Sequence, residues 1–262
     1  MDRKAQSEVW GTLDRATLDR IVREGPQPVF ATISGAHLYG FASPDSDVDL
    51  RGAFVTPARD VLGLQPPSET QSVESSVGGI QLDFVAHDIR KFARMMIQHN
   101  GYVLEQLYSP LVVFTGPDHE ELCKIGRGCV TRSVFRHYRG FAHGRRRLLS
   151  EPGATVKHLL YAYRVYLSGI HTLRSGDIEA NVLVLNDESR LSQIDDLVAR
   201  KKEGAEKMAL GDGEVEAHNK HLDALEAQLE EAHQRSILPE EPTSRRELED
   251  FVVRVRLKSL ET

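Results

Sequence analysis

The chain has 262 residues, of which 40% are hydrophobic, and it carries a formal net charge of -6. This length and composition suit one or two globular domains with a buried core, and the negative charge argues against a protein that coats nucleic acid through bulk attraction. Because the sequence has a polar N-terminus, no apolar run of about eighteen residues and only two cysteines, Cys123 and Cys129, we expect a cytoplasmic protein without a membrane span, a signal peptide, a disulfide framework or structural zinc.

The first half of the chain combines one helical pattern with three strand patterns. Apolar residues recur at helical spacing from Gln6 to Glu24, which predicts an amphipathic helix. The stretch from Pro57 to Gly79 is polar and rich in Pro, Ser and Gly, which predicts a long loop. Short segments of apolar and β-branched residues predict strands before and after this loop, at residues 29–36, 48–56 and 79–86.

Helical patterns fill most of the remaining sequence. Asp88 is a predicted N-cap of a helix that stops at Asn100-Gly101, and a shorter helix follows at residues 102–108. From Asp118 onward nearly every segment shows helical spacing, including one long charged helix at residues 214–236.

The end of the chain and the order of the patterns complete the expected architecture. Ser244 and Glu247 form a capping-box pattern, which predicts a terminal helix. Strand patterns are confined to the first half, so the predicted fold class is α+β, with a small mixed sheet followed by helices. We expect a sheet domain with an N-terminal helix over residues 1–115 and a helical domain over residues 116–262.

The residues that indicate chemistry begin in the second predicted strand. Alternate residues of a strand share a face, so Asp47, Asp49 and Arg51 should project to the same side. The third predicted strand carries Asp83 among apolar neighbours, and its pairing with the second strand would bring this acid beside the first two. The sequence therefore predicts three clustered carboxylates.

Clustered carboxylates repel one another unless cations lie between them. Mg²⁺ or Mn²⁺ suits such oxygen ligands, and a pair of these ions supports in-line displacement at a triphosphate. Asp47, Asp49 and Asp83 are therefore the predicted metal ligands and catalytic residues, and Arg51 is expected to add positive charge at the nucleotide. The alternative interpretation is an exposed turn for the first two acids, a solvent-facing Asp83 and a structural ion pair for Arg51.

This stretch resembles the polymerase-beta-like nucleotidyltransferase superfamily, whose pattern is a Gly-Ser pair, a turn, Asp-x-Asp and a later strand Asp. The resemblance is close from Val29 to Leu111, and it implies a palm-like sheet, an NTP substrate and a metal cofactor. Several short segments look like the branch that is sometimes found associated with RNA ligases: Leu38-Tyr39-Gly40, Pro44-Asp45-Ser46-Asp47, Arg51-Gly52, Ile89-Arg90-Lys91-Phe92, Asn100 and Leu104-Glu105.

The chain departs from the family pattern at one position. Ala36 follows Gly35 where the pattern has Ser, so a phosphate-contacting hydroxyl is missing. Ser34, Gly35 and Ala36 are nevertheless the predicted nucleotide-binding turn, because glycine lets the backbone approach a triphosphate closely. Loss of one neutral hydrogen bond costs about 1 kcal/mol, which predicts weakened activity rather than none.

A basic face is predicted in the second half of the chain. Arginine and histidine recur there at helical spacing, which predicts a phosphate-binding surface; the alternative is a face balanced by acidic neighbours. In the next predicted helix, Lys157 and Tyr161 are expected to reach the nucleotide, as lysines and tyrosines do in similar enzymes. The basic face comprises Arg132, Arg136, Arg139, His143 and Arg146, with Arg145 and Arg147 at its end.

Together these patterns predict a metal-dependent nucleotidyltransferase that moves a nucleoside monophosphate from an NTP to an acceptor hydroxyl, with an RNA 3′ end as the favoured acceptor. Two alternatives remain open. Ala36 favours a weakly active or inactive nucleotide- or RNA-binding relative. The other is an interaction partner in a toxin and antitoxin pair, in which the transferase modifies a protein tyrosine. The sequence does not define an oligomeric state.

Overall fold

The computed structural model describes residues 13–77, 79–204, 209–211 and 213–260, and its contacts divide the chain into two compact units. The first unit, which contains the sheet, comprises Met1–Gly35, Asp47–Val130 and Glu241–Thr262. The second, helical unit comprises Ala36–Ser46 and Thr131–Glu240. The units therefore interleave along the chain.

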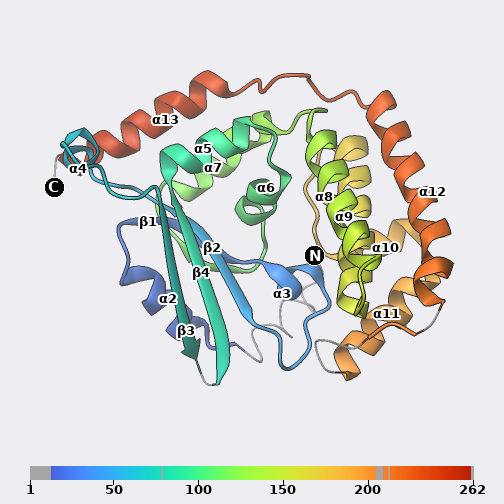
Figure 1. Cartoon of the computed structure of the whole chain (residues 1–262). Helices are drawn as coiled ribbons and strands as arrows, with labels where there is room; N and C mark the ends of the chain where they lie inside the picture. Colours follow the sequence, from blue (N-terminus) through green and yellow to red (C-terminus); the bar gives the residue numbers. More distant parts are fainter. Residues whose placement is uncertain (1–12, 78, 205–208, 212, 261–262) are drawn as a thin grey trace. The chain divides into compact units, whose positions relative to one another are not determined.

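The sheet unit contains a five-stranded mixed sheet, so the predicted α+β class is confirmed (Figure 1). Its strand order is β3-β4-β2-β1-β5; β2 and β4 run parallel, and the other neighbours are antiparallel. The strands are β1 (Pro28–Ile33), β2 (Val48–Phe54), β3 (Thr70–Val77), β4 (Ile80–Asp88) and β5 (Val112–Thr115).

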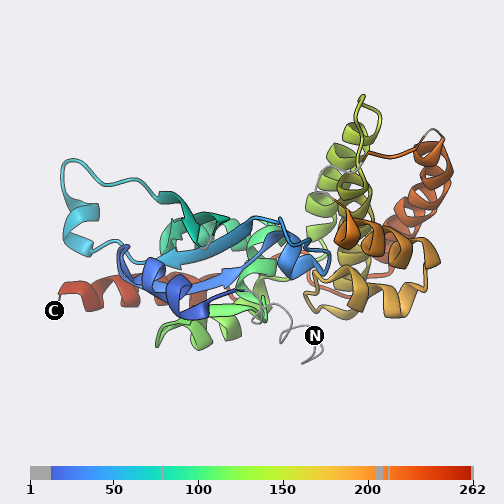
Figure 2. The same cartoon turned by 90° about the horizontal axis from the view of Figure 1, so that it is seen from below.

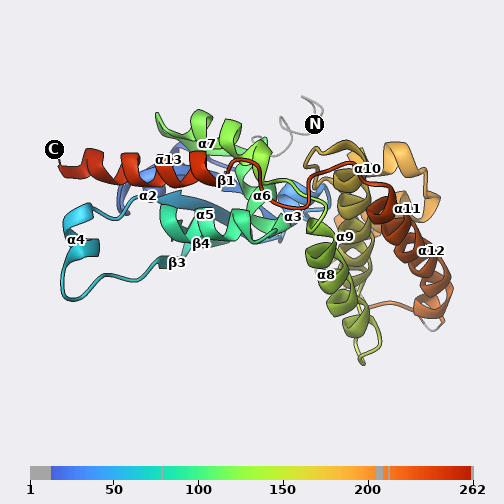
Figure 3. The ribbon, with the colours of Figure 1, turned by 90° about the horizontal axis from the view of Figure 1, so that it is seen from above.

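Helices cover β1 on the face that also carries Arg51. Phe30 of β1 packs edge-on against Phe92 and stacks on His119, and the Thr32 hydroxyl donates to the Gln106 carbonyl at 2.8 Å. These contacts come from three helices, and α13 packs in turn on two of them, α5 and α7 (Figure 3). The helices of this unit are α2 (Arg15–Arg23), α4 (Ala58–Leu62), α5 (Ile89–Ile97), α6 (Gly101–Leu107), α7 (His119–Gly126), η1 (Arg127–Cys129), α13 (Arg245–Leu257) and η2 (Lys258–Leu260).

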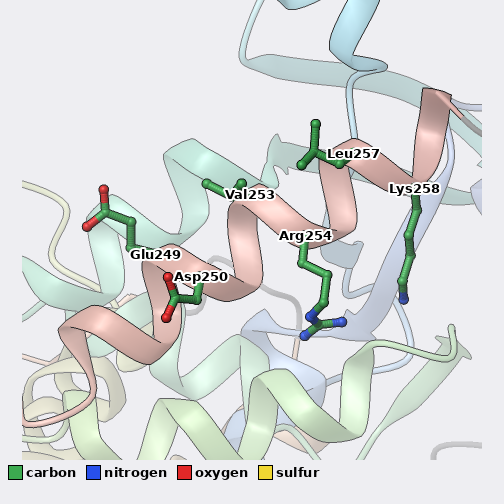
Figure 4. A pocket seen from close by; sticks show the side chains of 6 residues that line it. All are labelled: Glu249, Asp250, Val253, Arg254, Leu257 and Lys258. Carbon is green, nitrogen blue, oxygen red and sulfur yellow. The ribbon is translucent and has the colours of Figure 1, made fainter.

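The C-terminal helix α13 is joined to the sheet unit by a buried ion pair. Arg256 donates to Asp88 at 2.6 Å, and Asp88 is only 2% exposed. Side chains on the outer surface of α13 line a shallow groove, formed by Glu249, Asp250, Val253, Arg254, Leu257 and Lys258 (Figure 4).

The helical unit has a core of aromatic and aliphatic side chains. Tyr138, Tyr163 and Tyr166 are fully buried, and α12 packs against both α8 and α9 (Figure 2). No helix in the described part of the chain is long and apolar enough to cross a membrane. The helices of this unit are α3 (Gly35–Tyr39, with Gly35 at the boundary), α8 (Val134–Leu149), α9 (Val156–Ser175), α10 (Val182–Ser189), α11 (Ser192–Glu203) and α12 (Glu214–Arg235).

The predicted loop from Pro57 to Gly79 is wrong, because this stretch contains α4 and β3. The chain reverses at Gly79, which has a φ of 86°, and β3 then pairs antiparallel with β4. β3 lies at the edge of the sheet and consists mainly of Thr, Gln, Ser and Glu, so it lacks the apolar alternation that marks a half-buried strand. The short edge strand β5 was not predicted.

Helix boundaries were predicted unevenly. Asp88 does cap α5, since its Oδ1 accepts from the Arg90 amide at 2.9 Å. Asn100 does not stop that helix; α5 ends at Ile97, and the Asn100 side chain accepts from the Tyr102 amide as the N-cap of α6. The predicted terminal helix does begin after Ser244, which is the N-cap residue of α13, but no capping box forms because the buried Ser244 hydroxyl donates to the Ile125 carbonyl at 2.7 Å.

The first predicted helix is shorter than expected within the described residues. It begins at Arg15, because the Asp14 side chain caps it by accepting from the Ala16 amide at 3.0 Å. The predicted residues 6–12 lie outside the part of the chain that the structure describes.

Two helix glycines test the packing of the helical unit. A Cβ at Gly140 would meet no atom within 4 Å, whereas a Cβ at Gly169 would lie 2.8 Å from both Leu229 and Tyr138 side-chain atoms. Because Ala favours helix over Gly, Gly140→Ala should raise the free energy of unfolding by about 0.5–1 kcal/mol. Gly169→Ala should lower it by about 1–3 kcal/mol through overpacking. Urea unfolding measures both, and equal effects would contradict the packing of α9 against α8 and α12.

Candidate functional site

Two aspartates face each other across the parallel strands β2 and β4. Asp49 is the register partner of Asp83, as the predicted pairing of these strands requires. Adjacent strands lie about 5 Å apart, so two carboxylates on one face repel strongly unless a cation lies between them. The Arg51 guanidinium has this role: its Nη2 donates to Asp49 Oδ1 at 2.7 Å and to Asp83 Oδ2 at 2.8 Å.

Arg51 is held in place by several further hydrogen bonds. Its Nη1 donates to the carbonyls of Asp83 at 2.6 Å and Leu50 at 2.9 Å, and its Nε donates to the Tyr102 hydroxyl at 3.2 Å. Burial disfavours the charged guanidinium, but Tyr102 and the two carboxylates outweigh this effect and raise the Arg51 pKa. The side chain is 11% exposed, whereas those of Asp49 and Asp83 are 31% and 44% exposed. The carboxylates therefore remain accessible to a ligand while Arg51 lies beneath them.

Asp47 occupies a different position from the other two acids. It is exposed and directly precedes β2. Among the residues that the structure describes, no three Asp, Glu, His or Cys side chains gather in a metal-binding arrangement. The structure thus brings together Asp49, Asp83 and Arg51, and Asp47 stays a predicted third ligand.

Gly35 lies directly against the Asp49 carboxylate. Its φ is 60°, and a Cβ at this position would lie 1.9 Å from Asp49 Oδ2. The neighbouring Ser34 amide donates to the Asp49 carbonyl at 2.8 Å, which fixes the end of β1 beside β2. Only glycine is compatible with both this backbone conformation and this contact. The structure therefore shows the backbone at Gly35 in close approach to the Asp49 carboxylate, whereas the predicted approach was to a triphosphate.

The two residues next to Gly35 are both buried. Ser34 is fully buried and Ala36 is 6% exposed. The Ser34 hydroxyl has no hydrogen-bond partner. In this conformation the Ser34 side chain is not accessible to a nucleotide, so it does not replace the hydroxyl that is missing at Ala36. Their predicted role in nucleotide binding stays a prediction that rests on the backbone of the turn.

Lys157 and Tyr161 belong to α9 in the helical unit. The Tyr161 ring packs edge-on against the rings of Tyr39 and Phe41, at centroid distances of 5.5 and 5.3 Å. The Arg145 guanidinium lies 4.7 Å from the centre of the same ring. These contacts give Tyr161 a packing role, and its nucleotide contact, like that of Lys157, stays a prediction.

The basic face of α8 is largely neutralised by acidic residues of the same unit. Arg146 pairs with Asp223 at 2.6 Å and with Glu226 at 3.0 Å. His143 contacts Glu226 at 2.7 Å, and the remaining pairs are Arg139 with Glu230 at 3.5 Å and Arg132 with Glu240 at 2.9 Å. The prediction of a phosphate-binding face is corrected to its alternative, a face balanced by acidic neighbours, because most of these acids project from α12, which packs along α8.

Several residues near the acids were not predicted. Tyr102 anchors Arg51, and on the same sheet face His87 contacts the Thr70 hydroxyl at 3.0 Å, to which Lys91 also donates. Burial is the main cause that lowers the His87 pKa to about 4, with Lys91 and Arg51 adding to the effect. No local pattern marks these residues, because Thr70 and His87 meet only through the pairing of β3 with β4, and Tyr102 and Lys91 reach the sheet from α6 and α5.

The chain matches one protein family over most of its length. A sequence model of the RNA repair pathway DNA polymerase beta family matches residues 12–254. An uncharacterised protein of Methanocaldococcus jannaschii is 32% identical over 157 residues, which are 59% of this chain and 63% of that protein. An uncharacterised 38.9 kDa protein of Enterobacteria phage T4 is 30% identical over 114 residues, which are 41% of this chain and 34% of the phage protein. The chain thus spans less than two thirds of either relative.

One solved structure is also similar. The crystal structure of a nucleotidyltransferase-like protein from Exiguobacterium sibiricum aligns with 92% of this chain and 79% of its own chain. The sequence identity is 16% and the TM-score is 0.32.

The contact between Gly35 and Asp49 predicts a strong coupling between the two positions. Gly35→Ala should lower the free energy of unfolding by about 3 kcal/mol, through left-handed backbone strain and the clash with the carboxylate. In an Asp49→Ala background the carboxylate is gone and only the Cβ of residue 49 remains, 3.0 Å away, so little more than the backbone cost of about 1–2 kcal/mol should remain. A double-mutant cycle by urea unfolding measures the difference, and additive effects would contradict the contact.

The lowered pKa of His87 predicts a loss of stability in acid. The unfolded chain takes up this proton near the ordinary value of 6.5, whereas the folded protein takes it up only at about 4. Stability should therefore be complete above pH 6.5 and should fall as the pH is lowered to about 4. His87→Gln should flatten this dependence, as measured by urea midpoints between pH 7 and 4. The pKa of His137 is also lowered to about 4, and this residue is present in both the wild type and His87→Gln. If the two proteins lose stability equally between pH 7 and 4, the assignment to His87 is refuted.

Proposed function

The chain belongs to the RNA repair pathway DNA polymerase beta family, a family of polymerase-beta-like nucleotidyltransferases, and we propose that it transfers a nucleoside monophosphate from an NTP to an acceptor hydroxyl. The observation that carries the proposal is the register pairing of Asp49 with Asp83 beside Gly35. In the transfer, the acceptor oxygen forms a bond to the α-phosphorus, the bond to the leaving β-phosphate oxygen breaks, and pyrophosphate is released.

The carboxylate pair fits a divalent metal ion. Asp49 and Asp83 are half-buried oxygen donors on one sheet face, and Arg51 compensates one of their two negative charges. The net charge of -1 attracts a cation, and hard oxygen donors suit Mg²⁺ or Mn²⁺. Asp47, at the start of β2, is the proposed third ligand. When bound, such ions neutralise the phosphates and lower the pKa of a coordinated hydroxyl.

The residues of the chain divide the remaining tasks. The Gly35 turn, which has no side chain to fill the space beside Asp49, admits the triphosphate close to the backbone. Asp83, the more exposed carboxylate of the pair, takes up the proton of the acceptor hydroxyl. Arg51 keeps both carboxylates oriented through its fixed hydrogen bonds.

We propose an RNA 3′ end as the acceptor. The support is the description of the family, which names an RNA repair pathway. The basic face of α8 lends no support, because Arg132, Arg139, His143 and Arg146 of this face pair with acids of the same unit.

Transfer should depend on both paired carboxylates. Purified protein is incubated with each labelled NTP, Mg²⁺ or Mn²⁺ and total RNA, and pyrophosphate release and labelled RNA are measured. Asp49→Asn and Asp83→Asn should each lower kcat at least about a thousandfold, since each removes several kcal/mol of charge stabilisation. Asp60→Asn, at an exposed position of α4, is the matched control and should act like the wild type.

Other outcomes would select the alternatives. Activity of Asp49→Asn near the wild-type level would contradict the site. Nucleotide binding by the wild type without pyrophosphate release from any NTP would favour the inactive relative that Ala36 suggests. Label that appears on a co-expressed protein and never on RNA would replace the proposed acceptor with a protein hydroxyl.

A further inference from the structure

The short segment Ala36–Ser46 is packed within the helical unit, although the residues at both of its ends, Gly35 and Asp47, belong to the sheet unit. Gly35 and Asp47 are also two of the proposed functional residues. The side chains that hold the segment therefore act on the backbone that directly precedes Asp47.

Aromatic and backbone contacts fix the first half of the segment. The guanidinium of Arg164, which is 1% exposed, lies 4.0 Å from the centre of the Tyr39 ring. Tyr161, which lies on α9 together with Arg164, also packs against the Tyr39 ring. The chain then turns at Gly40, with a φ of 86°, where a Cβ would lie 2.3 Å from the Asn181 side chain. No larger residue fits there without displacing Asn181.

A hydrogen-bonded turn fixes the second half. The Ser46 amide donates to the Ser43 carbonyl at 2.9 Å, and the Ser43 amide donates to the Ser46 hydroxyl at 3.0 Å. The two hydroxyls are also 3.0 Å apart. Lys201 of α11 donates to the Ser43 hydroxyl. The residue that follows this turn is Asp47.

Lys201 is an unusual residue for this position. It is fully buried, whereas the next residue of the same helix, Lys202, is exposed. An ammonium group taken out of water is retained only where hydrogen bonds compensate for the lost hydration. A leucine or methionine would fill the same space without this cost, so packing alone does not explain the choice of lysine.

We infer that Lys201 is a positioning residue for Asp47, which acts by holding the Ser43–Ser46 turn. The role of Asp47 in this inference rests on the proposed function. The contact by which Lys201 holds the turn does not rest on the proposed function, because it follows from the hydrogen bonds of Lys201, Ser43 and Ser46 alone.

The test compares Lys201→Met with Lys202→Met in the full-length protein. Hydrogen exchange of the Ser43 and Ser46 amides, which needs no activity, should be about tenfold faster in Lys201→Met and unchanged in Lys202→Met. The affinity for Mn²⁺, measured by electron paramagnetic resonance, should fall about tenfold in Lys201→Met only. The kcat for transfer should fall by a similar factor, while the nucleotide KM changes by less than about threefold.

If Lys201→Met does not fold, Ser46→Ala replaces it, since this change removes only the hydroxyl that accepts from the Ser43 amide. Exchange that is equal in the two lysine variants would overturn the inference. So would faster exchange with unchanged Mn²⁺ affinity, which would show a purely structural lysine. A wild type that neither binds Mn²⁺ nor transfers nucleotide would refute the proposed function and the role of Asp47, and the exchange rates would still decide whether Lys201 holds the turn.

Discussion

The carboxylates of Asp49 and Asp83 lie side by side because β2 and β4 run parallel in one register, and the surrounding residues compensate for the resulting repulsion. Arg51 donates to both acids and is itself fixed by two carbonyls and by Tyr102. Because one guanidinium compensates only one of two negative charges, the cluster keeps a residual charge that favours a cation. Gly35 leaves the space beside the Asp49 carboxylate open, since any side chain at residue 35 would collide with Asp49.

The positively charged side chains of the helical unit contact other parts of the same unit. Arg139 and Arg146 of α8 form ion pairs with acids of α12, and the buried Arg164 lies over Tyr39. These cations join helices to one another and to the segment Ala36–Ser46. Exposed ion pairs contribute little individually, whereas a buried cation whose partner is removed is costly. The buried Arg164 and Lys201 therefore constrain this unit more than the conspicuous basic face does.

The sequence predicted those features that depend on local periodicity. Alternation in β2 was enough to place Asp49 and Arg51 on one face, and the apolar pattern of β4 marked Asp83 as a strand residue. Local periodicity could not reveal β3, because this edge strand has no buried face that would impose an alternation of apolar and polar residues. The predicted helix stop at Asn100 and the predicted capping box at Ser244 failed for a related reason. Each side chain has more than one possible backbone partner, and only tertiary structure decides between them.

The basic face of α8 shows the same limit at longer range. Its partners Asp223 and Glu226 lie about 80 residues away, and nothing in the local pattern distinguishes an arginine that awaits a phosphate from one that already pairs with an acid. Ala36 can be judged more firmly, because its effect is local. Gly35 can approach Asp49 because residue 35 has no side chain and because the Ser34 amide donates a hydrogen bond to the Asp49 carbonyl. Neither feature needs a hydroxyl at residue 36. Alanine at position 36 therefore leaves the carboxylate pair and the glycine turn intact.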